Sequence, residues 1–184
     1  MRTDYIDRKT ATAVFSQMQP VNRLICEVAM NTGLRIDDVC ALRTQDIRKA
    51  KRKSGWLTVT EQKTGKSKRL RFRYKDLDRM LWQSGQVFVF QNRNDATRHR
   101  TRQAVWRDLA RSAKPLRQQG INVSPHSLRK LYAVEQYEKH GDLKKVQKQL
   151  NHDNISTTLL YVMSREMAGQ KKAIKRPLEK KNKL

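Results

Sequence analysis

Acidic residues, cysteines and long apolar runs are all scarce in this 184-residue chain. Against 41 Lys and Arg there are 17 Asp and Glu, so the formal net charge is +24 at pH 7. Such an excess opposes a compact fold through self-repulsion and indicates a polyanionic partner. Nucleic acid suits this better than a membrane, because no apolar run approaches the roughly 20 residues of a spanning helix. The first ten residues also lack the apolar stretch of a signal peptide, so we expect a cytoplasmic protein.

The two cysteines, Cys26 and Cys40, both fall in apolar helical patterns and form no CxxC pair. We predict that they are reduced, buried packing residues. Together with the four histidines they show no metal-ligand spacing, so we expect neither a metal nor a cofactor. A hydrophobic content of 37% in a chain of this length is enough to build the core of one domain.

Hydrophobic periodicity in the first half predicts helices over residues 10–18, 20–32, 35–43 and 74–83. Pro20 suits the first turn of the second helix, and Gly33 suits its C-cap. Residues 46–73 change character: two β-prone runs, 55–62 and 67–73, flank the turn sequence KTGK at 63–66 and predict a hairpin. An apolar run at 85–91 is expected to be buried and to lead into a loop. The fold class is therefore α+β, mostly helical with a small antiparallel sheet.

In the second half, residues 101–120 read as one amphipathic basic helix ending at Gly120. Ser124 is a candidate N-cap with Pro125 in the first turn, and the helix that they begin is expected to end at Gly141. Its apolar stripe would be Leu128, Leu131, Tyr132 and Val134. Two short helices follow, over 142–150 and 154–162, in which Leu150, Ile155, Leu159 and Leu160 are expected to pack. Residues 166–184 read as a basic tail.

Several charged side chains stand where a phosphate could be bound and attacked. His126 and Arg129 are three residues apart at the start of a helix, so they share a face near its N-terminal N–H groups. Arg35 follows a helix-ending glycine, and Lys63 lies at the expected hairpin tip. Each residue alone, like His152 or Tyr161, would usually be a surface or packing residue. Their joint order along the chain favours a nucleophilic tyrosine surrounded by cations that stabilise the developing phosphate charge.

The segments that carry these residues resemble the tyrosine recombinases of the phage integrase family. "NTGLRIDDVCALRTQDI" is similar to the family's first arginine box, "EQKTGKSKRLRF" to its hairpin lysine segment, and "SPHSLRKL…LNHDNISTTLLYV" to its second box. The resemblance covers about residues 8–165. It implies strand cleavage and rejoining through a metal-free 3′-phosphotyrosine intermediate on Tyr161. The catalytic set that it implies is Arg35, Lys63, His126, Arg129, His152 and Tyr161, with Asp38 as a buried supporter of the arginines.

The sequence departs from the family pattern at two points. Asn151 stands where most members have glycine, but asparagine tolerates a left-handed turn, so we expect the turn to survive. The family also usually carries an amino-terminal core-binding domain, whereas here the catalytic region, assigned to residues 1–165, begins almost at once. A fragment and a minimal recombinase, similar to the fimbrial switch inverters, both fit this layout.

The basic runs at 48–55 and 98–102 predict phosphate contacts that carry no sequence information. The DNA-contacting residues predicted from these runs and the following helix are Arg48, Lys49, Lys51, Arg52, Arg98, Arg100, Arg102 and Arg107. The helix over 101–114, which also holds Arg111, is a candidate for the major groove. The resemblance implies double-stranded DNA at a recombination site, a homo-tetramer on paired sites and accessory DNA-bending proteins as partners. A catalytically idle DNA-binding protein of the same fold, a type IB topoisomerase and a basic RNA-binding module stay open as alternatives.

Overall fold

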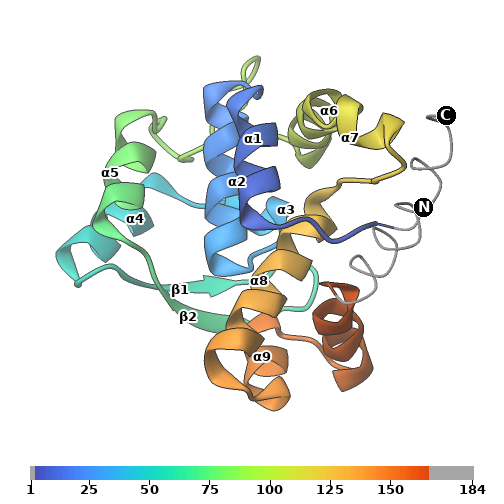
Figure 1. Cartoon of the computed structure of the whole chain (residues 1–184). Coiled ribbons are helices and arrows are strands. Elements are labelled where there is room, and N and C mark those ends of the chain that lie inside the picture. The colour runs from blue at the N-terminus through green and yellow to red at the C-terminus, as the bar shows by residue number, and fades with distance from the viewer. Residues whose placement is uncertain (1–2, 166–184) are drawn as a thin grey trace, which may run out of the picture.

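The structure, a computed structural model, describes residues 3–165. Its helices surround a central helix, α2, and a two-stranded antiparallel sheet lies below that helix in the view of Figure 1. The elements are α1 Arg8–Ser16, α2 Pro20–Thr32, α3 Ile36–Cys40, α4 Thr44–Arg52, β1 Trp56–Thr60, β2 Ser67–Arg71, α5 Tyr74–Trp82, α6 Arg102–Ser112, α7 Lys114–Gln118, α8 Pro125–His140 and α9 Leu143–Leu150. Residues 155–165 are also helical. The predicted α+β class is confirmed, and the basic tail at 166–184 lies outside the described residues.

Helix α2 forms the centre of the core, as its periodicity predicts. The buried side chains on it include Leu24, Ile25, Cys26, Val28, Ala29 and Met30. Gly33 ends the helix with φ +66°, and a Cβ there would lie 2.6 Å from the Tyr132 ring of α8. A glycine is therefore required for both the left-handed turn and the close approach of α8. Cys26 and Cys40 are free and buried, as predicted, and burial raises the pKa of the Cys40 thiol to about 12.

The hairpin is confirmed, with a register that pairs Trp56 with Arg71 and Thr60 with Ser67. Val59 is its one buried strand residue, so one face of the sheet packs on the body while the other faces solvent. The turn between the strands closes through the Glu61 N–H, which donates to the Lys66 carbonyl at 3.0 Å. Gly65 has φ +66° there, in agreement with the turn chemistry of the sequence.

Helix α8 begins and ends where the sequence predicts. The Ser124 hydroxyl accepts from the His126 N–H at 3.2 Å, and the Ser127 hydroxyl accepts in return from the Ser124 N–H at 3.2 Å. Gly141 terminates the helix with φ +65°. Asn151 ends α9 in the left-handed region, at φ 51° and ψ 37°, so the expected turn survives without glycine. These caps determine where the chain leaves each helix, and so where His126 and His152 lie.

The structure differs from the predicted helices at two places. Helix α4 was not predicted; it precedes the β-prone runs and overlaps the basic run at 48–55. Its buried positions, Thr44, Ile47 and Ala50, are few, so the apolar signal is weak against the surrounding charge. The single helix predicted over 101–120 is divided into α6 and α7 at Ala113. Pro115 explains the break, because proline has no N–H to donate to the preceding turn.

Two predictions about burial are also partly wrong. Of the leucines and isoleucine expected to pack near the C-terminal end, Leu150 is buried, but Ile155, Leu159 and Leu160 are exposed. Thr158 takes the buried position on that helix instead. In the apolar run at 85–91, Val89 and Phe90 are buried while Val87 is 43% exposed. Spacing alone did not tell which face of a short apolar segment turns inward.

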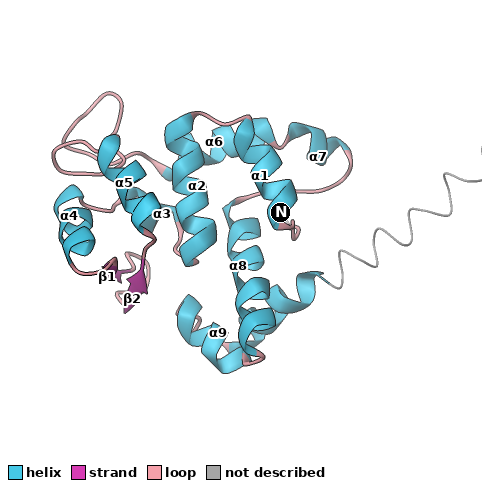
Figure 2. Ribbon diagram, turned by 60° about the vertical axis from the view of Figure 1, so that its left-hand side comes forward, coloured by secondary structure: helices cyan, strands magenta, loops and turns pink. Residues whose placement is uncertain are grey.

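In the fold, the two basic segments lie apart, whereas the three segments that resemble the family motifs lie close together. Helices α4 and α5 lie on one side of α2, and α6 and α7 on the other, while α8 and α9 extend below toward the hairpin (Figures 1 and 2). In residues 3–165, no helix combines the length and apolarity needed to cross a bilayer. The candidate site residues lie at the start of α3, in the hairpin turn, in the first turns of α8, at the end of α9 and on the helix over 155–165.

Candidate active site

Arg129 is the most deeply buried residue of the predicted catalytic set, at 3% exposure. One terminal nitrogen, Nη1, donates to the Gly33 carbonyl at the end of α2. The other, Nη2, donates to the Leu150 carbonyl at the end of α9 at 3.0 Å and lies 3.5 Å from His152 Nε2. Because the last carbonyls of a helix lack intrahelical donors, this guanidinium satisfies two of them at once. Arg129 therefore joins α8, on which it lies, to the ends of α2 and α9.

Lys68 on β2 makes the same kind of bridge one residue earlier on each helix. Its Nζ donates to the Thr32 carbonyl at 3.3 Å and to the Gln149 carbonyl at 2.9 Å. Burial is the largest cause that lowers its pKa to about 8, and the nearby Arg129 charge adds to the effect. Lys68 was not among the predicted site residues, although its cross-strand partner is Val59, the buried position of β1. Strand alternation read across the hairpin would have placed it on the inner face.

Arg35 precedes α3 and projects toward the hairpin turn. Its Nη1 forms an ion pair with the carboxylate of Glu61, whose side chain is fully buried, while the Arg35 side chain keeps 24% exposure. Glu61 was not predicted as a site residue. The predicted supporter, Asp38, is buried beside this pair; one of its oxygens, Oδ1, accepts from the Gln62 N–H at 2.9 Å. Burial raises the pKa of Asp38, and the Gln62 N–H and the two arginines oppose that shift.

Tyr161 and His126 meet directly. The tyrosine hydroxyl lies 3.1 Å from His126 Nδ1, although 35 residues separate them in the sequence. Burial, followed by the charges of Arg129 and Arg35, lowers the pKa of His126, so the imidazole is neutral at pH 7 and able to accept a proton. Burial raises the pKa of Tyr161, although both arginines oppose the shift. The phenol therefore holds its proton at neutral pH and needs an acceptor to become a nucleophile.

The ring of His152 makes a T-shaped contact with the Tyr161 ring, with centroids 5.2 Å apart and an interplanar angle of 88°. Its Nδ1 lies 2.9 Å from the hydroxyl of Thr158, which is completely buried and which the sequence did not single out. Burial, with the charges of Arg129 and Arg35, lowers the His152 pKa to about 4. The ring is therefore neutral at pH 7. Because Arg129 can only donate, Nε2 faces it as an acceptor and Nδ1 carries the proton toward Thr158.

Lys63 is exposed in the turn between β1 and β2, and within residues 3–165 it makes no hydrogen bond or ion pair. Its charge is among the smaller causes that lower the His126 pKa, after burial and the arginines. Three residues further along, Lys66 forms an ion pair with Asp153, just after the end of α9. This pair joins the turn to the segment that leads to Tyr161. The structure thus brings five predicted residues into one cluster, Arg35, His126, Arg129, His152 and Tyr161, and places Lys63 at its edge.

The residues predicted to contact DNA lie in two separate groups. Arg48, Lys49, Lys51 and Arg52 are exposed on α4, where Lys51 pairs with Asp78 at 2.6 Å. Near α6, the exposed members are Arg98, Arg102 and Arg107; of these, Arg98 pairs with Asp95 and Arg102 with Asp37. Arg100 differs, because its Nε donates to the buried Asn22 side chain. That bond gives Arg100 a structural task in addition to the predicted one.

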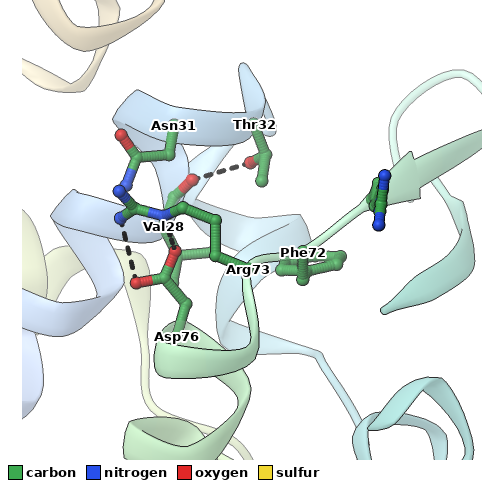
Figure 3. Close-up of a pocket in the computed structure, with 7 residues that line it drawn as sticks. Val28, Asn31, Thr32, Phe72, Arg73 and Asp76 are labelled. Atoms are coloured by element: carbon green, nitrogen blue, oxygen red, sulfur yellow. Dashed lines mark hydrogen bonds and ion pairs between the residues drawn. The ribbon is translucent and has the colours of Figure 1, made fainter. Parts of the chain in front are cut away.

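A pocket of about 160 Å³ lies elsewhere, between the end of α2 and the start of α5. It is lined by Val28, Asn31, Thr32, Arg71, Phe72, Arg73 and Asp76 (Figure 3). The Arg73 guanidinium, which points into this region, is held by Asp76 at 2.8 and 3.1 Å. None of the predicted site residues lines this pocket. Within residues 3–165, no group of three His, Cys, Asp or Glu side chains has the arrangement of a metal site.

Comparison with known proteins identifies the family and agrees with the fold. Residues 5–167 match the Phage integrase family, and the chain belongs to that family. Tyrosine recombinase XerA of Pyrococcus furiosus is 30% identical over 146 residues, which cover 76% of this chain and 49% of XerA. Tyrosine recombinase XerC of Xanthomonas campestris is 33% identical over 149 residues, covering 76% of this chain and 43% of XerC. The chain spans about half the length of the curated relatives that it matches.

Solved structures share the fold at lower identity. A lambda integrase dimer bound to a COC′ core site superposes with a TM-score of 0.70 and 22% identity, covering 90% of this chain and 49% of the integrase. The crystal structure of XerA recombinase gives a TM-score of 0.66 and 19% identity, covering 91% of this chain and 63% of that chain. These likenesses show that the chain has the fold found in integrase and Xer recombinase structures.

Proposed function

We propose that this chain is the catalytic domain of a site-specific DNA recombinase that cleaves and rejoins strands through a 3′-phosphotyrosine on Tyr161. The observation that carries the proposal is the 3.1 Å contact between the Tyr161 hydroxyl and His126 Nδ1, inside a cluster that also holds Arg35 and Arg129. A nucleophile, a proton acceptor and two fixed cations are what an attack on a phosphodiester requires. The family membership supports the same reaction.

In the first step, the Tyr161 oxygen attacks the scissile phosphorus while its proton passes to His126 Nδ1. The lowered pKa of His126 leaves the imidazole free to accept that proton at neutral pH. The bond from phosphorus to the 5′ oxygen breaks, and that oxygen takes a proton from Lys63. One phosphodiester is exchanged for another, so rejoining is the reverse reaction with a 5′ hydroxyl and needs no external energy.

The arginines stabilise the charge that accumulates on the non-bridging phosphate oxygens. Each guanidinium offers five N–H donors in a fixed plane, so both have donors left for phosphate beside the bonds described above. Removing one preorganised donor of this kind typically costs about 10²–10³ in rate. The positive charge that the reaction needs comes from side chains, and the proposal therefore includes no metal or cofactor. With phosphate bound, His152 would be a hydrogen-bond donor through Nε2 in its other tautomer, in which Nδ1 accepts from the Thr158 hydroxyl.

The proposed partner is double-stranded DNA at a recombination site, bound by a tetramer of this protein on two paired sites. Support comes from structures with the same fold, including a lambda integrase tetramer bound to a Holliday junction. The exposed cations of α4 and of the region before and along α6 would contact phosphates, since such contacts give affinity without sequence information. We assign residues 1–165 to the catalytic domain and 166–184 to a basic tail. We also propose accessory DNA-bending proteins as partners.

A suicide substrate tests the proposal. In such a duplex, a nick close to the cleavage point lets the short 5′-hydroxyl product diffuse away, so the covalent intermediate accumulates. Candidate sites would be taken from DNA that flanks the gene. We expect the wild-type chain to form a covalent adduct that resists denaturant, and the Tyr161→Phe variant to bind the same DNA without forming it.

The same assay separates the alternatives. A chain that binds the site but forms no adduct is an idle DNA-binding protein, and the proposal is then wrong. Relaxation of a supercoiled plasmid that lacks any recombination site would instead indicate a topoisomerase. Product that depends on the site and exchanges partner strands supports the recombinase.

A further inference from the structure

Glu61 is an unusual residue for its position. It lies at the end of β1 in a strongly basic chain, and its side chain is completely buried. Burying a carboxylate is costly unless it is paired and hydrogen-bonded. Here Oε2 pairs with Arg35 Nη1 and also accepts from the Thr64 hydroxyl at 2.9 Å. The other oxygen, Oε1, has no hydrogen-bond partner within residues 3–165. All the hydrogen-bond partners of this buried carboxylate thus belong to Arg35 and to the hairpin turn.

The backbone that carries Glu61 is fixed on both sides. The Glu61 N–H donates to the Lys66 carbonyl at 3.0 Å, and the Gly65 N–H donates to the Glu61 carbonyl at 2.9 Å. The next residue, Gln62, donates its N–H to the buried Asp38. Glu61 is therefore the rigid member of its ion pair, while the partly exposed Arg35 is the long and adaptable one. In such a pair, the carboxylate determines where the guanidinium lies.

We propose that Glu61 is a positioning residue that aims Arg35 at the scissile phosphate and links it to the turn that carries Lys63. The inference rests on the proposed function. Glu61 holds Nη1 of Arg35, so the remaining N–H groups of that guanidinium point away from the carboxylate and serve the phosphate. Through the Thr64 hydroxyl, the same carboxylate also fixes the residue that follows Lys63. One buried side chain thereby fixes the phosphate-binding arginine relative to the proton-donating lysine.

Asp38 does not fill this role in the structure. Its hydrogen bond goes to the backbone of Gln62, and its second oxygen, Oδ2, has no hydrogen-bond partner within the described residues. Asp38 therefore holds the segment that holds Glu61, and Glu61 is the carboxylate that contacts Arg35 directly.

A double-mutant cycle on cleavage of the suicide substrate tests the proposal. Glu61→Gln keeps the size of the side chain and removes its charge. We expect it to slow cleavage about 10- to 100-fold in the wild-type background, since residues in direct contact couple by this much. In an Arg35→Ala background, the same change should slow cleavage by less than about threefold, because the residue through which Glu61 acts is already missing. Equal losses in both backgrounds would show a merely structural role and overturn the proposal.

The matched control is Glu135→Gln. Glu135 is also paired with an arginine, Arg8, at 2.7 Å, but this pair joins α1 to α8 outside the cluster. We expect the cleavage rate of this variant to stay within about twofold of wild type. If Glu61→Gln does not fold, Glu61→Asp replaces it in the cycle; that side chain keeps its charge, but its carboxylate is too short to hold Arg35 in place.

A second measurement does not depend on catalysis. The side-chain ¹⁵N signals of Arg35, assigned by comparison with Arg35→Lys, report how freely its guanidinium rotates. We expect slow rotation in the wild-type chain and fast rotation in the Glu61 variant. Unchanged signals would overturn the proposal. If wild type forms no covalent adduct, the proposed function fails, but these signals still decide whether Glu61 holds Arg35.

Discussion

The two arginines of the site are held in opposite ways. On the α8–α9 side, Arg129 is buried and donates to main-chain carbonyls at the ends of two helices. On the hairpin side, Arg35 is partly exposed and is held by one side chain, Glu61. Main-chain contacts exist only when the helices are in place, so Arg129 is tied to the stability of the fold. Arg35 depends on a two-stranded sheet and one carboxylate, so we expect exposed residues of the hairpin turn such as Lys63 to be changed with less effect on folding.

Arg129→Met should have the largest combined effect, because it lowers both activity and stability. It removes a cation from the phosphate site, which costs about 10²–10³ in cleavage rate. It also leaves the Gly33 and Leu150 carbonyls without this donor, at about 1–3 kcal/mol for each buried group. Urea unfolding together with suicide-substrate cleavage checks both effects. If Arg129→Met loses activity at unchanged stability, the conclusion that Arg129 also stabilises the fold is wrong.

Lys63→Ala should lose activity while the urea midpoint stays unchanged, because Lys63 has no hydrogen bond or ion pair within the described residues. We expect a rate loss of about 10²–10⁴, typical of a missing proton donor. A substrate with sulfur in place of the 5′ oxygen has a leaving group that needs no proton, and it should restore the rate of Lys63→Ala. It should not restore Arg129→Met. Lys66→Ala, in the same turn, is the control and should cleave the ordinary substrate.

Lys68→Met tests the second cation that bridges the helix ends. The unfolded chain holds the Lys68 proton up to about pH 10.5, whereas the folded chain, with a pKa of about 8, releases it earlier. Between these values the unfolded state binds more protons, so stability rises with pH. The free energy of unfolding of wild type should therefore rise relative to Lys68→Met by about 1–3 kcal/mol between pH 8 and pH 10.5. If the free energy of unfolding of wild type relative to Lys68→Met stays constant or falls over this pH range, the lowered pKa of Lys68 is wrong.

The smallest expected effect is at Asn151, which ends α9 with φ 51°. Glycine adopts this conformation without steric cost, so Asn151→Gly should leave stability unchanged or raise it by roughly 0.5 kcal/mol. Asn151→Val should lower it by about 1–2 kcal/mol, because a β-branched residue is strained there. Thermal unfolding of the two variants checks this. If Asn151→Val raises the stability, the left-handed conformation at this residue is not required.

The sequence predicts the α8–α9 side well because its signals are local. Ser124, Pro125, Gly141 and Asn151 mark helix ends through backbone chemistry that a few neighbouring residues determine. Once those ends are fixed, His126 and Arg129 share a face, and His152 begins the segment that leads to Tyr161. The resemblance to a known family then named the residues that the structure brings together.

The sequence did not reveal Glu61, Lys68 or Thr158, which surround those residues. Glu61 and Lys68 are charged, and charged residues in a basic chain read as solvated unless their partners are known. Their partners, Arg35 and the carbonyls of Thr32 and Gln149, lie far away in sequence. Helix α4 was missed for a related reason, because its three buried positions are outnumbered by exposed charges. Long-range pairing, rather than local propensity, decided the burial of Glu61 and Lys68.

The central claim, that Tyr161 attacks DNA, is tested most directly by locating the covalent bond. The adduct trapped on a suicide substrate would be digested with nuclease and trypsin and examined by mass spectrometry. Cleavage after Lys148 and Arg165 yields the peptide 149–165, which contains a single tyrosine. We predict that this peptide carries the phosphonucleotide on Tyr161. A phosphonucleotide on any other residue, or no adduct with a site that the chain binds, would contradict the account.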